Sequence, residues 1–94
     1  MSKMTATPKQ LIDNDRVTVT EWRFKPGDAT GYHRHAHDYV VVPLTTGKLR
    51  LVEPDGTREA PLTVGVPYFR SEGVEHDVIN ANAFDFAFIE IEIK

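Results

Sequence analysis

Alternating apolar and polar residues fill most of the chain, and this pattern predicts short β-strands separated by turns. The run RVTVTEWRF places Val17 and Val19 on one face of a strand but Trp22 and Phe24 on the other. This change of phase predicts either a bulge near Glu21 or a strand that is partly covered on both faces. The loop KPGDATG follows, where a proline and two glycines interrupt the pattern.

The middle of the chain predicts a β-hairpin and then two further short strands. KLRLVE and TREAPLTV flank the turn sequence PDG at residues 54–56, as expected of two strands joined by a tight turn. GVPYFR is short and carries a proline, which favours a strand end or a sheet edge. In SEGVEHDVIN a turn precedes a strand that has His76, Val78 and Asn80 on one face.

The last segment, FDFAFIEIEIK, begins with Phe84, Phe86 and Phe88 on one side and continues with isoleucines on the other. Only PKQLIDN, near the N-terminus, has an apolar spacing compatible with a short helix. Several short strands at near-regular spacing predict an all-β sandwich or barrel. A chain of 94 residues has room for one hydrophobic core, so we expect a single domain over residues 1–94.

Composition and charge exclude several classes of function. The chain is 40% hydrophobic and 27% charged, as in ordinary globular proteins, and its net charge is 11 − 14 = −3 without a basic block. This argues against nucleic-acid binding and against a polybasic membrane patch. There is no cysteine, so disulfides and thiolate metal sites are excluded. MSKMTATPKQ lacks the apolar centre of a signal peptide and no apolar run could span a bilayer, so we expect a cytoplasmic protein.

Three of the four histidines occupy alternate positions in GYHRHAHDYVVV. On one straight strand His33, His35, His37 and Tyr39 would share a face. The backbones of His33 and His35 would lie roughly 6 to 7 Å apart, so both rings could reach one metal ion at about 2.0 to 2.1 Å. A third histidine of the same straight strand is less well placed, unless the strand bends.

The remaining histidine, His76, lies far along the chain in GVEHDVIN, at the start of another expected strand. A His-x-His pair completed by a distant histidine is an arrangement that non-haem metal sites in barrels use. The alternative is a solvated histidine pair on a surface strand, which binds metal only adventitiously. The spacing alone leaves both interpretations open.

Glycines and histidines recur at two sets of spacings. In the first, Gly27 is followed after DATGY by His33 and His35, and the set ends near Gly47. In the second, Gly65 and Gly73 precede His76 and Asn80, with Ser71 at a position where the pattern has proline. The chain therefore resembles the cupin superfamily, and in particular small single-domain bacterial cupins of the conserved-barrel (cupin 2) type. Some of these are labelled as β-alanine catabolism proteins. The resemblance covers residues 27–80 and implies a double-stranded β-helix, or jelly-roll, barrel.

The chain departs from the cupin pattern at the carboxylate position. A three-residue gap after His35 places Tyr39 where the family has glutamate, and a four-residue gap places Val40 there. The neighbouring Asp38 has the wrong parity to point inward. The resemblance therefore implies a metal site of His33, His35 and His76.

Tyr39 and His37 are candidates for a fourth ligand or for a hydrogen-bond partner of the site. Three neutral imidazoles leave the full +2 charge on the metal, which strengthens its Lewis acidity and leaves coordination positions open. Such a donor set suits Fe, Mn, Ni, Zn or Cu, and the sequence does not choose among them.

These residues favour a small cupin that binds a divalent metal ion and acts on a small polar metabolite, with Tyr39 and His37 as acid, base or orienting groups. Cupin enzymes include dioxygenases, isomerases and lyases, so the reaction type stays open. The alternative is a cupin without turnover, in which the metal serves small-molecule binding, sensing or structure. Apolar side chains on both faces of the first and last strands favour a homodimer that packs these strands together.

Other polar and aromatic residues have simpler interpretations. Asn80 is expected to be mainly structural. Four arginines could bind a substrate carboxylate but are, as strand residues, more often solvated, namely Arg34, Arg50, Arg58 and Arg70. Five aromatic residues are expected in the barrel and interface core, namely Trp22, Phe24, Phe84, Phe86 and Phe88. Four glycines are expected in tight turns, namely Gly27, Gly47, Gly65 and Gly73.

Overall fold

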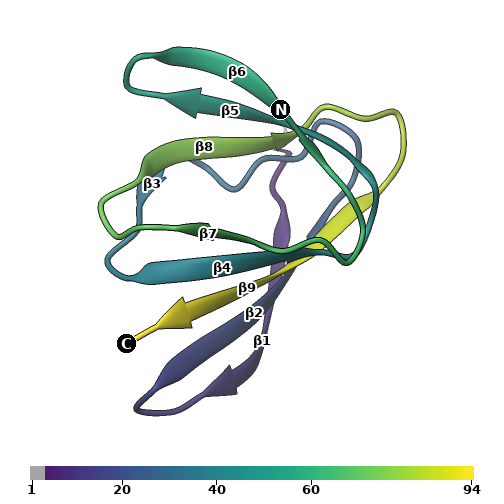
Figure 1. The fold of residues 1–94 in the computed structure, drawn as a ribbon. Helices are drawn as coiled ribbons and strands as arrows, with labels where there is room; N and C mark the ends of the chain where they lie inside the picture. Colours follow the sequence, from purple (N-terminus) through teal and green to yellow (C-terminus); the bar gives the residue numbers. More distant parts are fainter. Residues whose placement is uncertain (1–3) are drawn as a thin grey trace.

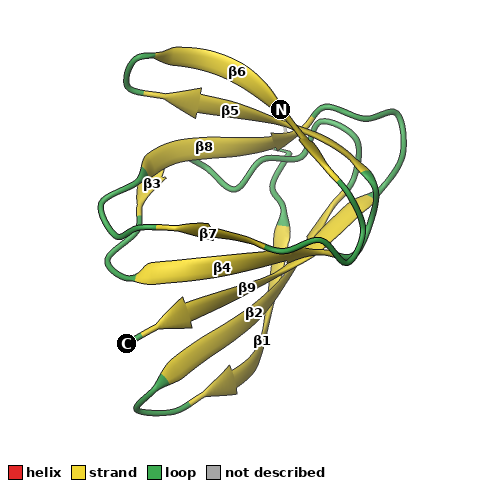
Figure 2. Ribbon diagram, in the orientation of Figure 1, coloured by secondary structure: helices red, strands yellow, loops and turns green. Residues whose placement is uncertain are grey.

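The computed structural model describes residues 4–94, which fold into nine β-strands joined by turns and loops (Figures 1 and 2). Residues 1–3 of the expected domain lie outside the described part of the chain. Within residues 4–94 no helix is long and apolar enough to cross a membrane. The strands are β1 (Thr7–Asp13), β2 (Val17–Phe24), β3 (His33–Arg34), β4 (Asp38–Pro43), β5 (Gly47–Glu53), β6 (Gly56–Leu62), β7 (Tyr68–Arg70), β8 (Glu75–Asn80) and β9 (Phe86–Ile93).

The strands form two sheets that face each other (Figure 1). One sheet has five strands in the order β1-β2-β9-β4-β7, and the other has four in the order β3-β8-β5-β6. Every strand pair within these sheets is antiparallel. The expectation of an all-β sandwich or barrel is confirmed.

The core lies between the sheets. Along β4 and β8 buried positions alternate strictly with less buried ones, so one face of each strand points into the core. His76, Val78 and Asn80 are all buried, as the alternation along β8 predicts. Both sheets contribute side chains to the apolar core. Its buried residues include Phe24, Tyr39, Val41, Leu49, Leu51, Leu62, Val78, Phe86 and Phe88. Phe84 is an exception among the aromatics expected in the core, because it precedes β9 and is 49% exposed.

The hairpin of β5 and β6 and the edge position of β7 agree with the expectations from sequence. Gly47 to Glu53 pair in register with Leu62 to Gly56, across the turn that Pro54 and Asp55 make. In β7 the strand begins directly after Pro67 and forms an edge of the five-stranded sheet. A proline just before an edge strand removes no hydrogen bond between paired strands.

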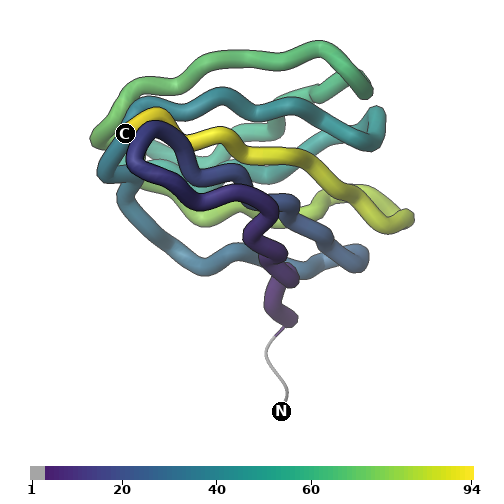
Figure 3. The backbone as a smooth tube through the Cα atoms, turned by 90° about the horizontal axis from the view of Figure 1, so that it is seen from below, coloured from purple at the N-terminus to yellow at the C-terminus, as the bar shows by residue number. Residues whose placement is uncertain are grey.

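The segment PKQLIDN is a strand and not a helix, so that expectation was wrong. It belongs to β1, which pairs with β2 from Thr7 to Asp13. Every residue of β1 is exposed, and backbone hydrogen bonds to β2 outweigh a weak helical spacing that had no apolar face to bury. In Figure 3 the purple N-terminal strands lie on the side of the molecule where the yellow C-terminal strand ends.

The phase change in β2 reflects cover on both faces and not a bulge near Glu21. From Val17 to Phe24 the strand pairs with β9 without any shift of register, and most of its residues are half-buried. The register shift lies on the partner strand β1, between Gln10 and Ile12. Of the two expectations, partial cover on both faces is the one confirmed.

Candidate metal centre

Three imidazole rings from two strands and a loop converge inside the barrel. His33 on β3 lies directly opposite His76 on β8 in the antiparallel register. His35 follows β3, and its Nε2 atom lies 3.0 Å from Nε2 of His33 and 3.0 Å from Nε2 of His76. One nitrogen from each ring lies within 4.8 Å of the others. The structure therefore brings together the three histidines that the two motifs singled out.

The chain bends after β3, and this bend places His35. The expected single strand from His33 to Tyr39 is interrupted, because β3 ends at Arg34 and β4 begins at Asp38. The His35 amide donates to the Val74 carbonyl at 2.9 Å, and the Gly73 amide donates to the His35 carbonyl at 2.8 Å. Gly73 has φ = 92°, a left-handed conformation that suits glycine. The second motif thus holds in place a histidine of the first.

The hydrogen bonding of His33 selects the tautomer that a metal site needs. Its Nδ1 atom donates to the carbonyl oxygen of Gly31 at 2.8 Å. In a neutral imidazole this leaves a lone pair on Nε2, which is the atom that faces His35. A backbone carbonyl on the far nitrogen is a common way of orienting a metal-binding histidine.

The donor set fits a divalent transition metal ion. Two nitrogens bound at about 2.1 Å and at right angles to each other lie about 3.0 Å apart, which matches both Nε2 separations of 3.0 Å in the cluster. Among residues 4–94, Nδ1 of His76 is buried without a hydrogen-bond partner. His76 therefore lacks the orienting contact that His33 has.

Burial keeps two of the three rings neutral. Burial, with a smaller contribution from charge on the nearby His33, lowers the pKa of His35 to about 4 and that of His76 to about 3. Both rings therefore present lone pairs at neutral pH. A cluster of neutral nitrogens of this kind can bind a positively charged metal ion.

Tyr39 supports the cluster from β4. Its ring stacks on His35 with centroids 3.9 Å apart and planes 20° from parallel. The hydroxyl is buried and has no hydrogen-bond partner among residues 4–94, and burial raises its pKa. Tyr39 thus faces inward as its parity predicts, while its role as ligand or acid stays a prediction.

His37 lies apart from the three converging rings. Its Nδ1 atom is 3.4 Å from a carboxylate oxygen of Glu92, and its side chain is 41% exposed. It still lines the same cavity as His33 and His35. The structure therefore does not bring His37 into the group of converging rings, whereas a role as acid or base stays a prediction.

A cavity of about 430 Å³ gives access to the histidines. One wall comes from β3 and the bend after it, and the opposite wall comes from the inner faces of β2 and β9. Its lining residues are Trp22, Thr30, His33, Arg34, His35, Ala36, His37, Val78, Phe88, Glu90 and Glu92. A space of this size suits a small molecule.

Glu90, which was not among the residues expected at the site, is a buried carboxyl group in this cavity. Burial, with a smaller contribution from the nearby Glu92, raises its pKa to about 7. A carboxyl group of this kind can give or accept a proton near neutral pH. The signal was present, because Glu90 continues the alternating face of Phe86 and Phe88 along β9. A glutamate thus faces the site from β9, not from the position that the cupin pattern gives it.

One of the four arginines, Arg70, is less solvated than expected, whereas Arg58 is 53% exposed. The Arg70 side chain is 24% exposed and donates to Glu53 at 3.3 Å, and Arg58 donates to the same carboxylate at 2.7 Å. Arg58 and Arg70 both line a second cavity, between β6 and β7. Arg34 and Arg50 are exposed, as their parity predicts. The sequence alone does not show which of these side chains lie beside an internal cavity.

Asn80 has the structural role that was expected of it. Its amide donates to the carbonyls of Phe24 and Phe84, and its oxygen accepts from Asn82. Gly47 serves a close approach and not a strained turn, because a Cβ atom there would lie 2.7 Å from the Asn82 side chain. These contacts join the ends of β5 and β8 below the site.

Comparison with known proteins agrees with this fold. No protein-family model matches the chain. It is 61% identical over 89 residues to the β-alanine degradation protein BauB of Pseudomonas aeruginosa, which covers 95% of this chain and 94% of that protein. It is also 58% identical to a cupin domain of Bordetella pertussis Tohama I, with a TM-score of 0.97 over 100% of this chain and 98% of that structure. The chain belongs to the cupin superfamily.

More distant cupins share only the fold. An RmlC-like cupin with a double-stranded β-helix from Methanocaldococcus jannaschii has a TM-score of 0.80 at 14% identity, over 96% of this chain and 81% of that one. The resemblance to small single-domain cupins and the jelly-roll barrel that it implied are confirmed.

Proposed function

We propose that this cupin holds one divalent transition metal ion, Fe, Mn, Ni, Zn or Cu, on His33, His35 and His76 and acts on a small polar metabolite. The observation that carries the proposal is the convergence of the three rings, with two Nε2 separations of 3.0 Å. When bound, the metal supplies Lewis acidity and lowers the pKa of a coordinated water. The cavity of about 430 Å³ beside the rings leaves room for a ligand.

The side chains around this cavity supply the proton chemistry of the proposal. Glu90 can exchange a proton with a bound molecule near neutral pH, since burial raises its pKa to about 7. Glu92 lies between Glu90 and the surface and pairs with His37, which is partly exposed. These three groups form a route by which a proton can reach solvent. Tyr39, stacked on His35, serves to orient the ring.

The relative from Pseudomonas aeruginosa supports breakdown of a small metabolite, since it is named a β-alanine degradation protein. The reaction can be of the dioxygenase, isomerase or lyase type, and the donor set does not select among these. Its three neutral ligands leave several coordination positions for substrate and water.

Metal content tests the proposal directly. Untagged protein, purified without a metal column, should contain near-stoichiometric metal by plasma mass spectrometry. A double variant, His33→Ala with His35→Ala, should contain none, whereas Arg34→Ala, on the residue between them, should match the unmodified protein. Metal-free protein that refuses Fe, Mn, Ni, Zn and Cu would contradict the proposed site.

A second candidate is a cupin without turnover, in which the metal serves binding, sensing or structure. The short pairing of β3 with β8 favours it, because only His33 with His76 and Arg34 with Glu75 are in register. A metal on His33 and His76 would join the two strands at this point. Under this candidate, removal of the metal should lower the melting temperature strongly, and no metabolite tested should be converted.

We also propose that the chain forms a homodimer through its β1–β2 hairpin and β9. All of β1 is exposed at the edge of its sheet, including Leu11 and Ile12, and Ile93 of β9 is exposed as well. An uncovered edge strand with apolar side chains favours pairing with a second copy. The cytoplasmic location stays a prediction from sequence.

Analytical ultracentrifugation at micromolar concentration should show a dimer, and Ile12→Glu should shift it toward monomer. Val64→Glu places the same charge on another exposed apolar residue, outside β1 and β9, and should leave the dimer intact. A monomer in the unmodified protein would contradict this assembly.

A further inference from the structure

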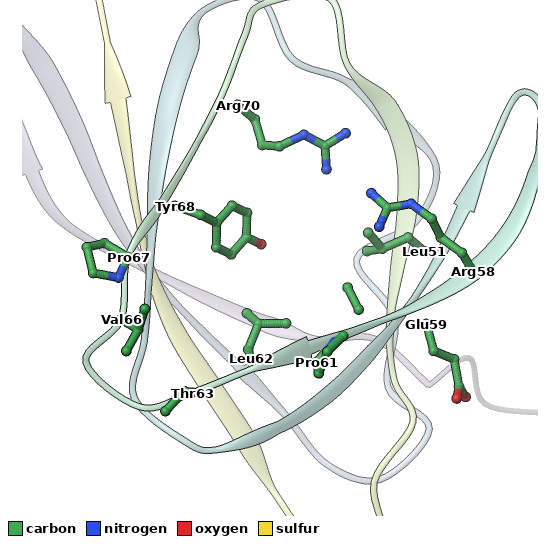
Figure 4. Close-up of a pocket in the computed structure, with 11 residues that line it drawn as sticks. Leu51, Arg58, Glu59, Pro61, Leu62, Thr63, Val66, Pro67, Tyr68 and Arg70 are labelled. Carbon is green, nitrogen blue, oxygen red and sulfur yellow. The ribbon is translucent and has the colours of Figure 1, made fainter.

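A second cavity, of about 460 Å³, opens between β6 and β7. These strands are the end strands of their two sheets, and the histidine cluster borders the opposite end, where β3 lies. Figure 4 shows the guanidinium groups of Arg58 and Arg70 pointing toward each other across this cavity. We name this space the arginine cavity.

The arginine cavity has a surplus of positive charge. Arg58 and Arg70 share one carboxylate, that of Glu53, at 2.7 and 3.3 Å. Arg58 donates through Nε and Arg70 through one terminal nitrogen, and their other N–H groups have no hydrogen-bond partner among residues 4–94. Glu59 also lines the cavity, but its carboxylate pairs with Lys48 and Arg50 and points away from the space in Figure 4. Two guanidinium groups and the Glu53 carboxylate therefore leave a net charge of about +1, which suits one anionic group.

The remaining walls of the arginine cavity are mainly apolar. Leu51, Pro61, Leu62, Val66 and Tyr68 surround it, and the Tyr68 ring points into the space in Figure 4. An inorganic ion would leave these walls uncovered, whereas an organic acid with a short apolar chain would bury them. The cavity therefore fits an amphipathic anion.

The arginine cavity also leads toward the histidines. Leu51, Tyr68 and Arg70 line a further, small cavity of about 10 Å³ together with Tyr39 and His76. The Tyr39 hydroxyl and Nδ1 of His76 are the buried side-chain atoms that have no partner among residues 4–94. Unpaired buried polar atoms are rare, and they point to a ligand or solvent group that satisfies them.

We propose that the arginine cavity binds a small monocarboxylic acid, whose carboxylate accepts from Arg58 and Arg70 and whose apolar chain lies on Leu51, Leu62 and Tyr68. This site goes beyond the proposed function and needs no bound metal. Glu53 holds the two guanidinium groups together when the site is empty and competes with the ligand for them.

The test uses the full chain, freed of metal with a chelator, so that a failure of the metal proposal does not affect it. Butyrate is titrated while the Nε–H resonances of Arg58 and Arg70 are followed by NMR. Both resonances should shift with saturation, and those of Arg34 and Arg50, which lie outside this cavity, should not. Butyramide, which has the same shape without the charge, should bind at least about tenfold more weakly, since hydrogen bonds to charged groups are the stronger ones. From propionate to hexanoate the affinity should rise up to about fourfold for each methylene.

Variants separate a binding role from a structural one. Arg70→Gln should weaken butyrate binding about tenfold or more, and Arg50→Gln, which removes the same charge from the outer face of β5, should not. Glu53→Gln should strengthen binding, because it removes the competing carboxylate, and a merely structural effect would not do so.

Three results would overturn the proposal. The first is an absence of saturable shifts in the two resonances. The second is equal displacement of butyrate by chloride or phosphate, which would show a general anion effect. The third is unchanged affinity in a folded Arg70→Gln protein.

Discussion

The histidine cluster and the arginine cavity occupy opposite ends of one barrel, and they treat charge in opposite ways. At the histidine end burial lowers the pKa of His35 and His76 far below neutrality, so both rings are neutral. At the arginine end the exposed Arg58 and the partly buried Arg70 both pair with Glu53, so the Glu53 carboxylate and the Arg70 guanidinium keep their charge while partly buried. The difference shows that an ionised group can stay charged inside a small barrel when it has a partner of opposite charge. The presence of this partner matters more than how deeply the group is buried.

The two ends are therefore suited to opposite ligands. Neutral nitrogens with lone pairs attract a cation, and paired guanidinium groups with spare donors attract an anion. Between them lies the small cavity that touches both Arg70 and His76. Each prediction below changes a residue at one of the two ends.

The largest expected effect is on metal binding at the histidine end. His76→Ala should weaken metal affinity by more than about 100-fold, since loss of a ligand's hydrogen-bond partner alone costs about 10- to 100-fold. His37→Ala should keep its metal, because His37 pairs with Glu92 outside the converging rings. Isothermal titration with Zn²⁺ or Ni²⁺ measures both. Loss of metal in His37→Ala would make His37 the fourth ligand and contradict the separation described above.

Glu90 should make stability depend on pH. Its pKa is about 7 in the folded protein and near its usual value of 4.5 when unfolded, so its contribution is fully present below pH 4.5 and is lost as the pH rises through 7. Relative to Glu90→Gln, the unmodified protein should lose up to about 3 kcal/mol of unfolding free energy between pH 5 and pH 8. Urea unfolding of the metal-free proteins at the two pH values measures this. A difference between the two proteins that does not change with pH would mean that Glu90 is ionised throughout.

Tyr39→Phe should raise the unfolding free energy by about 1 kcal/mol, because it removes a buried hydroxyl group that has no partner among residues 4–94. The ring that stacks on His35 is retained, so metal content should not change. Thermal unfolding and plasma mass spectrometry test the two parts. A loss of metal in this variant would instead identify the hydroxyl as a ligand.

The smallest expected effect is at the arginine end. Arg70→Gln should lower the unfolding free energy by about 1 kcal/mol, because Glu53 then keeps only Arg58 as a partner. Arg50→Gln breaks an exposed pair with Glu59 and should change stability by less than about 0.5 kcal/mol. Denaturant unfolding at pH 7 compares the two variants. Equal effects would show that the pairing with Glu53 adds nothing that a surface pair lacks.

The sequence by itself determined the strands of the barrel and the three histidines. Alternation along β8 placed His76, Val78 and Asn80 inside, and the two motifs selected His33, His35 and His76. Such features are predictable because the side-chain period of a strand and the spacing of a motif are local properties. The same reasoning failed for β1, where pairing with β2 overrode a weak local spacing.

Only the tertiary structure decided which other polar groups share the interior with the histidines. Glu90 and Arg70 follow ordinary strand patterns, and their local sequences do not distinguish them from the half-buried Glu92 or the exposed Arg50. The order of strands in the two sheets places Glu90 opposite the bend after β3, and it places Arg70 at the end where β6 and β7 face each other. Contacts between strands that are distant in the chain depend on the order of strands in the sheets. The alternation of side chains along a single strand contains no information about that order.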